Sequence, residues 1–371
     1  MPNRQIFIGL ISGTSLDGVD AVLVSFEDNR PHLLATHHEP YPAAIKQSIR
    51  DLCLPGSNEI DRMGSLDRLV AEVFSHAALR VVEAGGLTRD AIAAIGCHGQ
   101  TIRHRPELTP AFTLQICDPN TLSELTGITT VADFRRRDMA CGGQGAPLVP
   151  AYHKALFQQQ GQSRIVLNLG GIANITCLPA DTALPVTGYD TGPANTLLDS
   201  WAERHIGTCY DDQGGWARSG SSHPVLLDRL LEYDYFSLPA PKSTGTETFN
   251  LNWLLERVEQ LDVAPADVQA TLVELTVQTV AQAIEREGYA SSQILICGGG
   301  VHNDYLLERL SIRLPECSLS STQSYGVEPD WVEAITFAWL AKRTLSGLSG
   351  NLPSVTGATR ELILGGIYPA S

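Results

Sequence analysis

Several features that would define a function class at once are missing from this chain. No run of about 18 apolar residues, the length that spans a bilayer, occurs in its 371 residues. The N-terminus has no basic region followed by an apolar segment and a cleavage site, so we expect a protein of the cytoplasm with no membrane partner. A Walker A motif is also missing, because Lys242-Ser243-Thr244 has no upstream Gly-x-x-x-x-Gly. The sequence therefore excludes a P-loop fold.

Cysteines and basic residues are distributed in ways that exclude further classes. The eight cysteines are widely spread and include no Cys-x-x-Cys pair, which argues against a zinc site and against a disulfide framework. With 41 acids against 26 bases the net charge is -15, so we expect no basic face for a duplex nucleic acid. An anionic small ligand is compatible with this charge, because backbone amides and a few arginines hold phosphate in acidic proteins.

Two halves of the sequence repeat one order of elements. In each half a β-hairpin is followed by a strand, a long helix and a further strand that ends in a glycine-containing turn. These elements are expected at residues 6–26, 32–38, 60–83 and 92–97 in the first half and at 165–178, 186–189, 266–287 and 294–297 in the second. Additional elements are expected at 112–116, 120–125, 193–206, from 304 onward and at 330–346. The repetition predicts an α/β protein with lobes at 1–160 and 161–371, of which the tail at 352–371 packs back on the first lobe.

The turn inside the first hairpin is rich in groups that bind phosphate. Its members are Gly13, Thr14, Ser15, Leu16, Asp17, Gly18, Val19 and Asp20. Backbone amides and hydroxyls suit phosphate oxygens, and a carboxylate suits Mg²⁺, usually through water. Taken alone, such a turn is explained by an ordinary hairpin bend. The second hairpin has a similar glycine bend, and this repetition favours phosphate binding.

In the second half, glycines and one carboxylate fall where strands end. The glycines are Gly170, Gly171, Gly298, Gly299 and Gly300, with Asn168 beside the first pair. Glycine lets backbone approach a phosphate or a nucleoside closely, although any strand-to-helix turn uses such residues too. Asp190, in Gly-Tyr-Asp-Thr-Gly-Pro, is well placed to act on a ligand bound at the bend. Capping of the following helix explains Asp190 equally well.

Four charged or polar side chains are candidates for substrate contacts. They are His98, Arg135, Arg137 and Glu333. Guanidinium forks bind carboxylates bidentately, so three consecutive arginines beside a glycine-rich loop indicate a substrate with an acidic group. The alternatives are a solvated basic turn paired with Asp133 and Asp138, a structural histidine, and a glutamate in an exposed first turn of its helix.

Eight motifs, in order along the chain, resemble those of the 1,6-anhydro-N-acetylmuramic acid kinase family. They are GLISGTSLDGVDAVLV, GCHGQTIRH, ADFRRRD, GGQGAPLVPAYH, NLGGIANIT, GYDTGPANTLLD, PKSTG and ICGGGVHN. The family is part of the sugar kinase, heat-shock chaperone and actin superfamily, so the resemblance implies two ribonuclease-H-like lobes around a central ATP cleft. One position departs from the wider superfamily, because Ser12 stands where an Asp usually precedes the Gly-Thr. We therefore take Asp17 as the candidate that orients Mg²⁺.

The resemblance also implies a reaction and the roles of the candidate residues. Water opens the 1,6-anhydro bridge of 1,6-anhydro-N-acetylmuramate, and O6 takes the γ-phosphoryl of ATP, giving N-acetylmuramate 6-phosphate and ADP in murein recycling. Residues 13–20 would bind the phosphates of ATP and Asp190 would be the general base. Arg135 or Arg137 would bind the lactyl carboxylate, with His98 and Glu333 as further sugar contacts. A homodimer is implied as well.

Other functions of the same fold stay open at this point. An ordinary hexose or amino-sugar kinase would use Asp190 to deprotonate a hydroxyl group without opening a ring. A nucleotide-gated actin-like or chaperone-like protein would need a C-terminal peptide-binding extension or assembly insertions. A sugar-responsive regulator would need a helix-turn-helix at one end. We expect neither of the last two, because the chain leaves no room for these additions.

Overall fold

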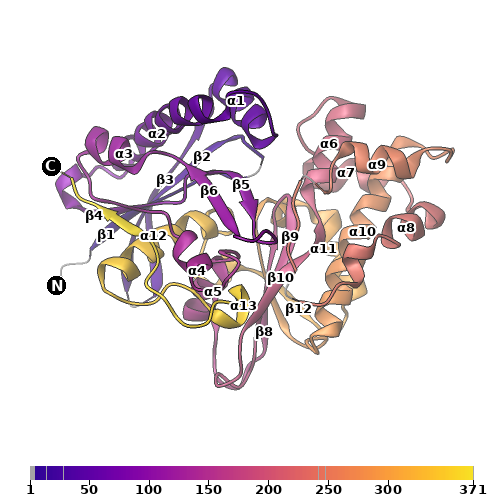
Figure 1. Ribbon diagram of the computed structural model, residues 1–371. Coiled ribbons are helices and arrows are strands. Elements are labelled where there is room, and N and C mark those ends of the chain that lie inside the picture. Colours follow the sequence, from indigo (N-terminus) through magenta and orange to yellow (C-terminus); the bar gives the residue numbers. More distant parts are fainter. Residues whose placement is uncertain (1–4, 14, 28, 241, 247, 371) are drawn as a thin grey trace. The chain divides into compact units, whose positions relative to one another are not determined.

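The protein forms two compact units (Figure 1), seen in a computed structural model that describes residues 5–13, 15–27, 29–240, 242–246 and 248–370. One unit comprises Met1–Leu156 and Trp331–Ser371, and the other comprises Phe157–Asp330. The chain passes from the first unit to the second between Leu156 and Phe157, close to the predicted boundary at residue 160. The return to the first unit, however, begins at Trp331, well before the tail at 352–371, because a whole helix packs on the first sheet.

The first unit is built on a six-stranded sheet with the order β13-β7-β4-β1-β2-β3. Its strands are β1 (Ile6–Ile11), β2 (Gly18–Glu27), β3 (Arg30–Pro40), β4 (Ile92–Cys97), β7 (Thr130–Ala132) and β13 (Gly366–Tyr368). The strands β1, β2 and β3 are antiparallel, whereas β4 runs parallel to β1 and β7 runs parallel to β4. A separate ribbon pairs β5 (Gln100–Arg105) with β6 (Phe112–Ile116).

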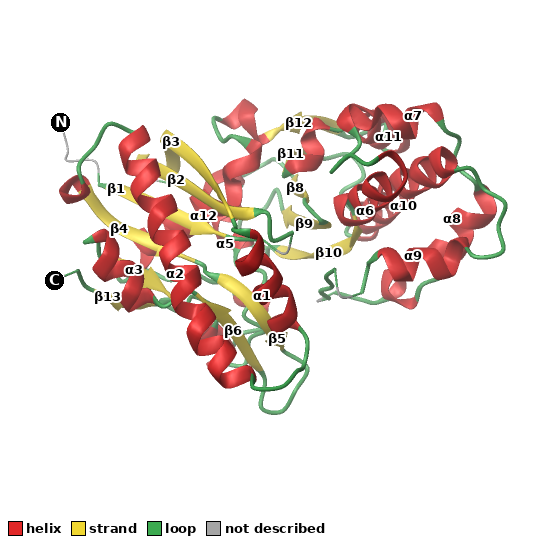
Figure 2. Cartoon of the chain, turned by 90° about the horizontal axis from the view of Figure 1, so that it is seen from above, coloured by secondary structure: helices red, strands yellow, loops and turns green. Residues whose placement is uncertain are grey.

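Helices cover both faces of this sheet. The helices of this part of the chain are α1 (Ala43–Cys53), α2 (Glu59–Ala84), α3 (Pro119–Thr126), α4 (Arg136–Ala140), α5 (Val149–Phe157), α12 (Val332–Leu345) and α13 (Pro353–Thr356). On one face α2 packs against β2 and β3, and on the other α12 packs against β1 and β4 (Figure 2). Because a strand points alternate residues to opposite faces, Ile8 joins the core under α2 while Gly9 faces α12.

Two glycines bring α12 into close contact with the sheet. A Cβ added to Gly9 would lie 1.8 Å from the Ala334 carbonyl oxygen, and one added to Gly96 would lie 2.0 Å from that of Phe337. Only glycine permits this distance between helix and strand backbones. The close approach explains why the chain from Trp331 onward belongs to the first unit.

The second unit repeats the strand plan of the first in a five-stranded sheet with the order β10-β9-β8-β11-β12. Its strands are β8 (Arg164–Leu169), β9 (Ile172–Leu178), β10 (Thr187–Pro193), β11 (Gln293–Cys297) and β12 (Ser318–Ser321). Here too the first three strands are antiparallel, and β11 and β12 continue the sheet in parallel from β8. This duplicated order is the ribonuclease-H-like plan, so the predicted α/β fold is confirmed.

The second unit carries most of its core beneath one long helix. The helices are α6 (Asn195–Ile206), α7 (Gly215–Ser219), α8 (Pro224–Leu231), α9 (Leu251–Val258), α10 (Pro265–Arg286) and α11 (Asp304–Arg313). The apolar α10 contacts β9 and β10 and is itself flanked by α6, α7, α8 and α11 (Figure 2). No helix in the described part of the chain is both long and apolar enough to cross a membrane.

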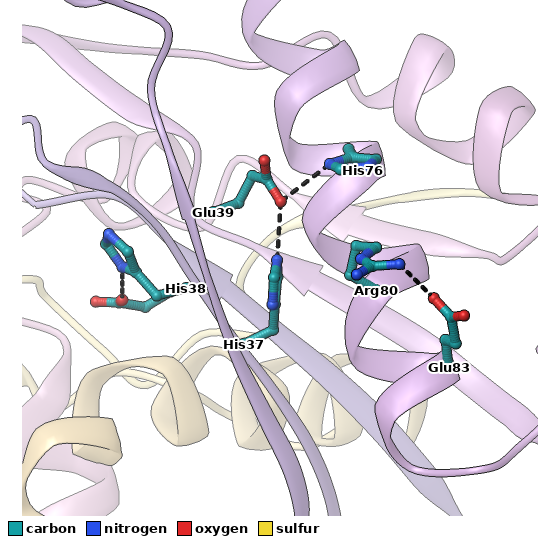
Figure 3. Close-up of polar contacts among 7 residues, drawn as sticks. His37, His38, Glu39, His76, Arg80 and Glu83 are labelled. Carbon is teal, nitrogen blue, oxygen red and sulfur yellow. Dashed lines mark hydrogen bonds and ion pairs between the residues drawn. The ribbon is translucent and has the colours of Figure 1, made fainter.

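Polar contacts join β3 to α2 at the edge of the first sheet (Figure 3). One carboxylate oxygen of Glu39 lies 2.8 Å from His37 Nε2 and 2.9 Å from His76 Nδ1. Burial alone would raise the pKa of Glu39, but hydrogen bonding by His37 and the charge of His76 outweigh burial, so this pKa lies below its ordinary value of 4.5. The Glu39 carboxylate is therefore held charged between a strand and a helix.

Candidate active site

The first phosphate-binding turn links β1 to β2, and its residue Thr14 lies outside the described residues. Gly13, Ser15 and Asp17 are exposed, whereas Leu16, Gly18 and Val19 are buried. Leu16 takes a positive φ of 58°, and its N–H donates to the Gly13 carbonyl at 3.4 Å, which closes the turn on itself. The buried side chains belong to the core, so they offer a ligand only their backbone.

The two carboxylates of this turn each have a basic partner. Asp17 Oδ1 lies 3.1 Å from Lys46 Nζ, with 66% of the Asp17 side chain exposed. Asp20 Oδ1 lies 2.8 Å from His38 Nδ1. Within the described residues no group of three or more His, Cys, Asp or Glu side chains could hold a metal ion. One exposed carboxylate fits an Mg²⁺ that keeps most of its waters and binds chiefly to nucleotide phosphates.

A buried glutamine that the sequence analysis did not single out supports the same turn. Gln100 is 1% exposed, and its Nε2 donates to the Gly13 carbonyl at 3.4 Å. The N–H of Tyr41 donates to the Asp17 carbonyl at 3.2 Å on the other side of the turn. The sequence feature that could have identified Gln100 is its position in the GCHGQTIRH motif.

Three of the four predicted substrate residues come together in the first unit. Nε of Arg135 donates to Nε2 of His98 at 3.0 Å, and His98 Nδ1 lies 2.9 Å from the Gly99 carbonyl. Burial, and then the charge of Arg135, lower the pKa of His98 well below its ordinary range, so the ring is neutral. Burial lowers the pKa of Arg135 to about 10, while the charges of Glu333 and Asp138 oppose this shift. Arg135 is therefore a cation at neutral pH.

Asp138 holds the loop that carries the carbonyl partner of Arg135. Asp138 is completely buried, and its Oδ2 accepts the N–H of Gly145 at 2.8 Å. The Gly145 carbonyl in turn accepts Nη1 of Arg135 at 2.9 Å. Asn351 and Thr356 donate to the other carboxylate oxygen, each at 2.8 Å. The basic-turn alternative is therefore wrong for Asp138, since its carboxylate binds a backbone N–H and two side chains of the C-terminal segment.

Arg137 lies apart from this group. Its Nη1 donates to the Ile363 carbonyl at 2.9 Å, and the residue is exposed. The neighbouring Arg136 lies 3.5 Å from Asp133, as the basic-turn alternative expects. Of the two arginines considered for a substrate carboxylate, Arg135 is the one beside the other candidates.

The glycine bend of the second hairpin is connected to the start of α6. The N–H of Asn195 donates to the Gly170 carbonyl at 3.0 Å, and the N–H groups of Ala194 and Thr196 donate to the Gly171 carbonyl at 3.0 and 3.1 Å. The opposite side of the bend is open, because added Cβ atoms would come no nearer than 3.6 Å to other atoms. The carbonyls of the bend thus accept the N–H groups at the start of α6, and the other side of the bend has room for a ligand.

The three consecutive glycines after β11 differ in their surroundings. A Cβ on Gly298 would lie 2.3 Å from Asn168 Oδ1, and one on Gly300 would lie 2.5 Å from Leu169 Cβ. Gly299 is exposed, and a Cβ there would meet only Asn195 Nδ2 at 3.8 Å. Packing against β8 explains two of these glycines, and Gly299 is the position open to a ligand.

Asp190 lies in β10 and does not cap α6. The strand continues to Pro193 through a bulge between Asp190 and Gly192, so it is longer than the predicted 186–189 and the helix starts later. The N-cap of α6 is Ala194, which makes no side-chain capping bond. Bulges re-aim side chains near active sites. The partly exposed Asp190 carboxylate instead accepts the N–H of Thr244 on Oδ2 at 3.0 Å.

Comparison with known proteins assigns the family. The sequence model described as anhydro-N-acetylmuramic acid kinase matches residues 5–370. The chain belongs to this family. It is similar to the curated anhydro-N-acetylmuramic acid kinase from Shewanella loihica, with 50% identity over 370 residues that cover 100% of both chains. It is also similar to the one from Coxiella burnetii, with 50% identity over 368 residues that cover 99% of this chain and 98% of that one. The resemblance drawn from the eight motifs is thereby confirmed.

Solved structures give a more distant likeness. One is a ROK family glucokinase from Streptomyces griseus in complex with glucose and AMPPNP, with a TM-score of 0.41, 12% identity and coverage of 91% of this chain and 99% of that one. A likeness at this level adds nothing to the family assignment, which depends on the full-length relatives.

Proposed function

We propose that the protein is an ATP-dependent kinase that opens the 1,6-anhydro ring of 1,6-anhydro-N-acetylmuramate and phosphorylates O6, giving N-acetylmuramate 6-phosphate and ADP. The observation that carries this proposal is the family match over residues 5–370. Half of the residues are identical to curated members over the full length of both chains. An ordinary sugar kinase or a chaperone-like protein would not explain a match of this extent.

Asp190 is the residue to which we assign the general base. Hydrolysis of a glycosidic bond ordinarily needs a second carboxyl group to protonate the leaving oxygen. Transfer of the γ-phosphoryl group to that oxygen can replace the acid, so one carboxylate suffices. The hydrogen bond from Thr244 to Oδ2 fixes how the Asp190 carboxylate is turned, as a base that must face one water requires.

Arg135 is the residue to which we assign the lactyl carboxylate, with His98 and Glu333 as sugar contacts. A guanidinium that is charged, half-buried and hydrogen-bonded through Nε and Nη1 presents a fixed edge to an anion. Neutral His98 adds no competing charge, and because Nε2 accepts from Arg135 while the Nδ1–H is directed at the Gly99 carbonyl, it would meet a sugar with the carbon edge of its ring. These contacts would distinguish a muramyl sugar from one without the lactyl group.

In the first unit, the exposed backbone of Gly13 and Ser15 would bind phosphate oxygens of ATP, and Asp17 would orient Mg²⁺ through water. In the second unit, we assign the exposed Gly299 and the partly exposed Gly171 to the nucleotide. Bound Mg²⁺ neutralises charge that develops during phosphoryl transfer. We also propose that the protein is cytoplasmic and forms a homodimer. Light scattering of the purified protein, which gives its molar mass in solution, would test the dimer.

The experiment that tests the function supplies purified protein with Mg-ATP and 1,6-anhydro-N-acetylmuramate. Mass spectrometry should find ADP and a sugar product that has gained one water and one phosphoryl group. A product that has gained only the phosphoryl group would indicate an ordinary sugar kinase. ATP hydrolysis without any sugar phosphate would contradict a kinase function.

A further inference from the structure

Lys242, two residues before Thr244 in the PKSTG motif, also lies against Asp190. The N–H of Asp190 donates to the Lys242 carbonyl at 3.3 Å, and the N–H of Thr244 donates to the carboxylate at 3.0 Å. The hydroxyl of Tyr235 donates to the Asp190 carbonyl at 2.7 Å. A segment about fifty residues further along the chain therefore holds the backbone and the side chain of Asp190 together.

The ammonium group of Lys242 connects the two parts of this segment. Lys242 Nζ donates to the carbonyls of Tyr235 and Phe236 at 3.0 and 3.3 Å, and it lies 4.6 Å from the centre of the Tyr235 ring. Arg286 donates to the Phe236 carbonyl from α10 at 3.3 Å. Without the ammonium group, the turn that carries Tyr235 would lose its bond to the loop that carries Thr244.

We propose that Lys242 is a positioning residue for the general base, because its ammonium group fixes the turn at Tyr235 against the PKSTG motif and so holds the carboxylate of Asp190 toward the attacking water. The inference deepens the proposed function and rests on it. Lys242 acts through Tyr235 and Thr244, so it changes the orientation of the base and leaves ATP binding to other residues.

The surroundings of Lys242 give this role a pH dependence. Burial, and then the charge of Arg286, lower the pKa of Lys242 to about 8, while Asp190 opposes the shift. The rings of Tyr189 and Tyr235 also face the ammonium, and burial raises the pKa of both phenols above their ordinary value, so they keep their protons in this range. The ammonium is therefore lost as pH rises through about 8, and turnover should fall with it.

The test compares kcat and the KM for ATP in the wild type, Lys242→Met and Lys242→Arg between pH 6.5 and about 9.5. Lys242→Met should lower kcat about ten- to hundredfold at pH 7 with little change in the KM for ATP, as expected when a base is misplaced. Lys242→Arg keeps its charge throughout, so it should retain activity at pH 7 and lose the alkaline fall of the wild type. Lys154→Met, on α5, is the matched control and should behave as wild type.

Each outcome decides the inference. An active wild type with no fall in kcat near pH 8, or a Lys242→Met enzyme with the kcat of wild type, would overturn it and leave the proposed function intact. If Lys242→Met does not fold, the wild-type and Lys242→Arg profiles decide, and an alkaline fall shared by both would overturn the inference. A wild type that forms no sugar phosphate would overturn the proposed function and this role together.

Discussion

His98 Nε2 accepts a hydrogen bond of 3.0 Å from Nε of Arg135. This bond requires a neutral histidine, and it sets the angle of a guanidinium whose Nη1 is bound to the Gly145 carbonyl. The arginine that we assign to the substrate is thus positioned by two partners from different motifs. Its orientation does not depend on the substrate.

Arg135→Ala should remove selectivity for the lactyl group. Losing one charge-assisted contact costs about 1.5–3 kcal/mol, or roughly ten- to hundredfold in kcat/KM for 1,6-anhydro-N-acetylmuramate. The anhydro sugar without a lactyl group should be affected far less. Arg137→Ala is the control and should discriminate as wild type does, because Arg137 is bound to the Ile363 carbonyl. If both variants keep the wild-type ratio of kcat/KM values, Arg135 has no part in recognising the carboxylate.

Asp190→Asn should reduce turnover and spare the fold. An amide cannot take a proton from water, and general-base help is worth about 10² to 10⁴ in rate. Asn can still accept the N–H of Thr244, so we expect an unchanged melting temperature and unchanged ATP affinity by calorimetry. Wild-type kcat in this variant would remove Asp190 from the mechanism.

Gly9→Ala and Gly96→Ala should each destabilise the protein. The added methyl groups would overlap carbonyl oxygens of α12 at 1.8 and 2.0 Å, and such overpacking costs about 1–3 kcal/mol or more. Gly64→Ala is the matched control, because Gly64 lies in the second turn of α2 and its added Cβ would meet no neighbouring element within 4 Å. It should stabilise by about 0.5–1 kcal/mol, the gain of Ala over Gly in a helix. Urea denaturation measures all three, and equal stability of Gly9→Ala and wild type would refute the close helix contact.

Glu39→Gln should change how stability depends on acid. The folded pKa of Glu39 lies below 4.5, so its contribution to stability is fully present above that pH and is lost as pH falls through the folded value. Glutamine keeps a neutral acceptor, and we expect about 1.5–3 kcal/mol less stability than wild type at pH 6, the worth of a hydrogen bond to a charged group. The difference should shrink below pH 4. A constant difference across this range in urea titrations would show that the carboxylate charge is unimportant.

Much of the fold was predictable because the strongest patterns are long and local. The hairpins, α2 and α10 have clear apolar periodicity over many residues, and their predicted ranges differ from the observed ones by at most one residue at each end. The strands β7 and β12 are three and four residues long, too short for a period to appear, and were missed. The helix α1 was missed as well, and its N-cap side chain makes no capping bond that would have marked its start.

The candidate site was predictable where a motif names the residue and less so where contacts cross the sequence. Asp190, His98 and Arg135 can be picked out by their residue type and by the motif residues that flank them in the sequence. The partners that hold them do not, because Tyr235 and Lys242 lie far along the chain from Asp190. Asp138 looked like an ion-pair partner of the arginines, and only its burial shows that it binds backbone amides.

The most direct test of the central claim is the reaction in ¹⁸O-water with Mg-ATP and 1,6-anhydro-N-acetylmuramate. The product should be an N-acetylmuramate 6-phosphate with one ¹⁸O at the anomeric carbon and none in the phosphate group, since water attacks carbon and phosphorus is transferred to O6. Unlabelled product kept in the same water for the same time corrects for exchange. A phosphorylated sugar that carries no ¹⁸O at the anomeric carbon, or one that carries ¹⁸O in its phosphate, would contradict the mechanism.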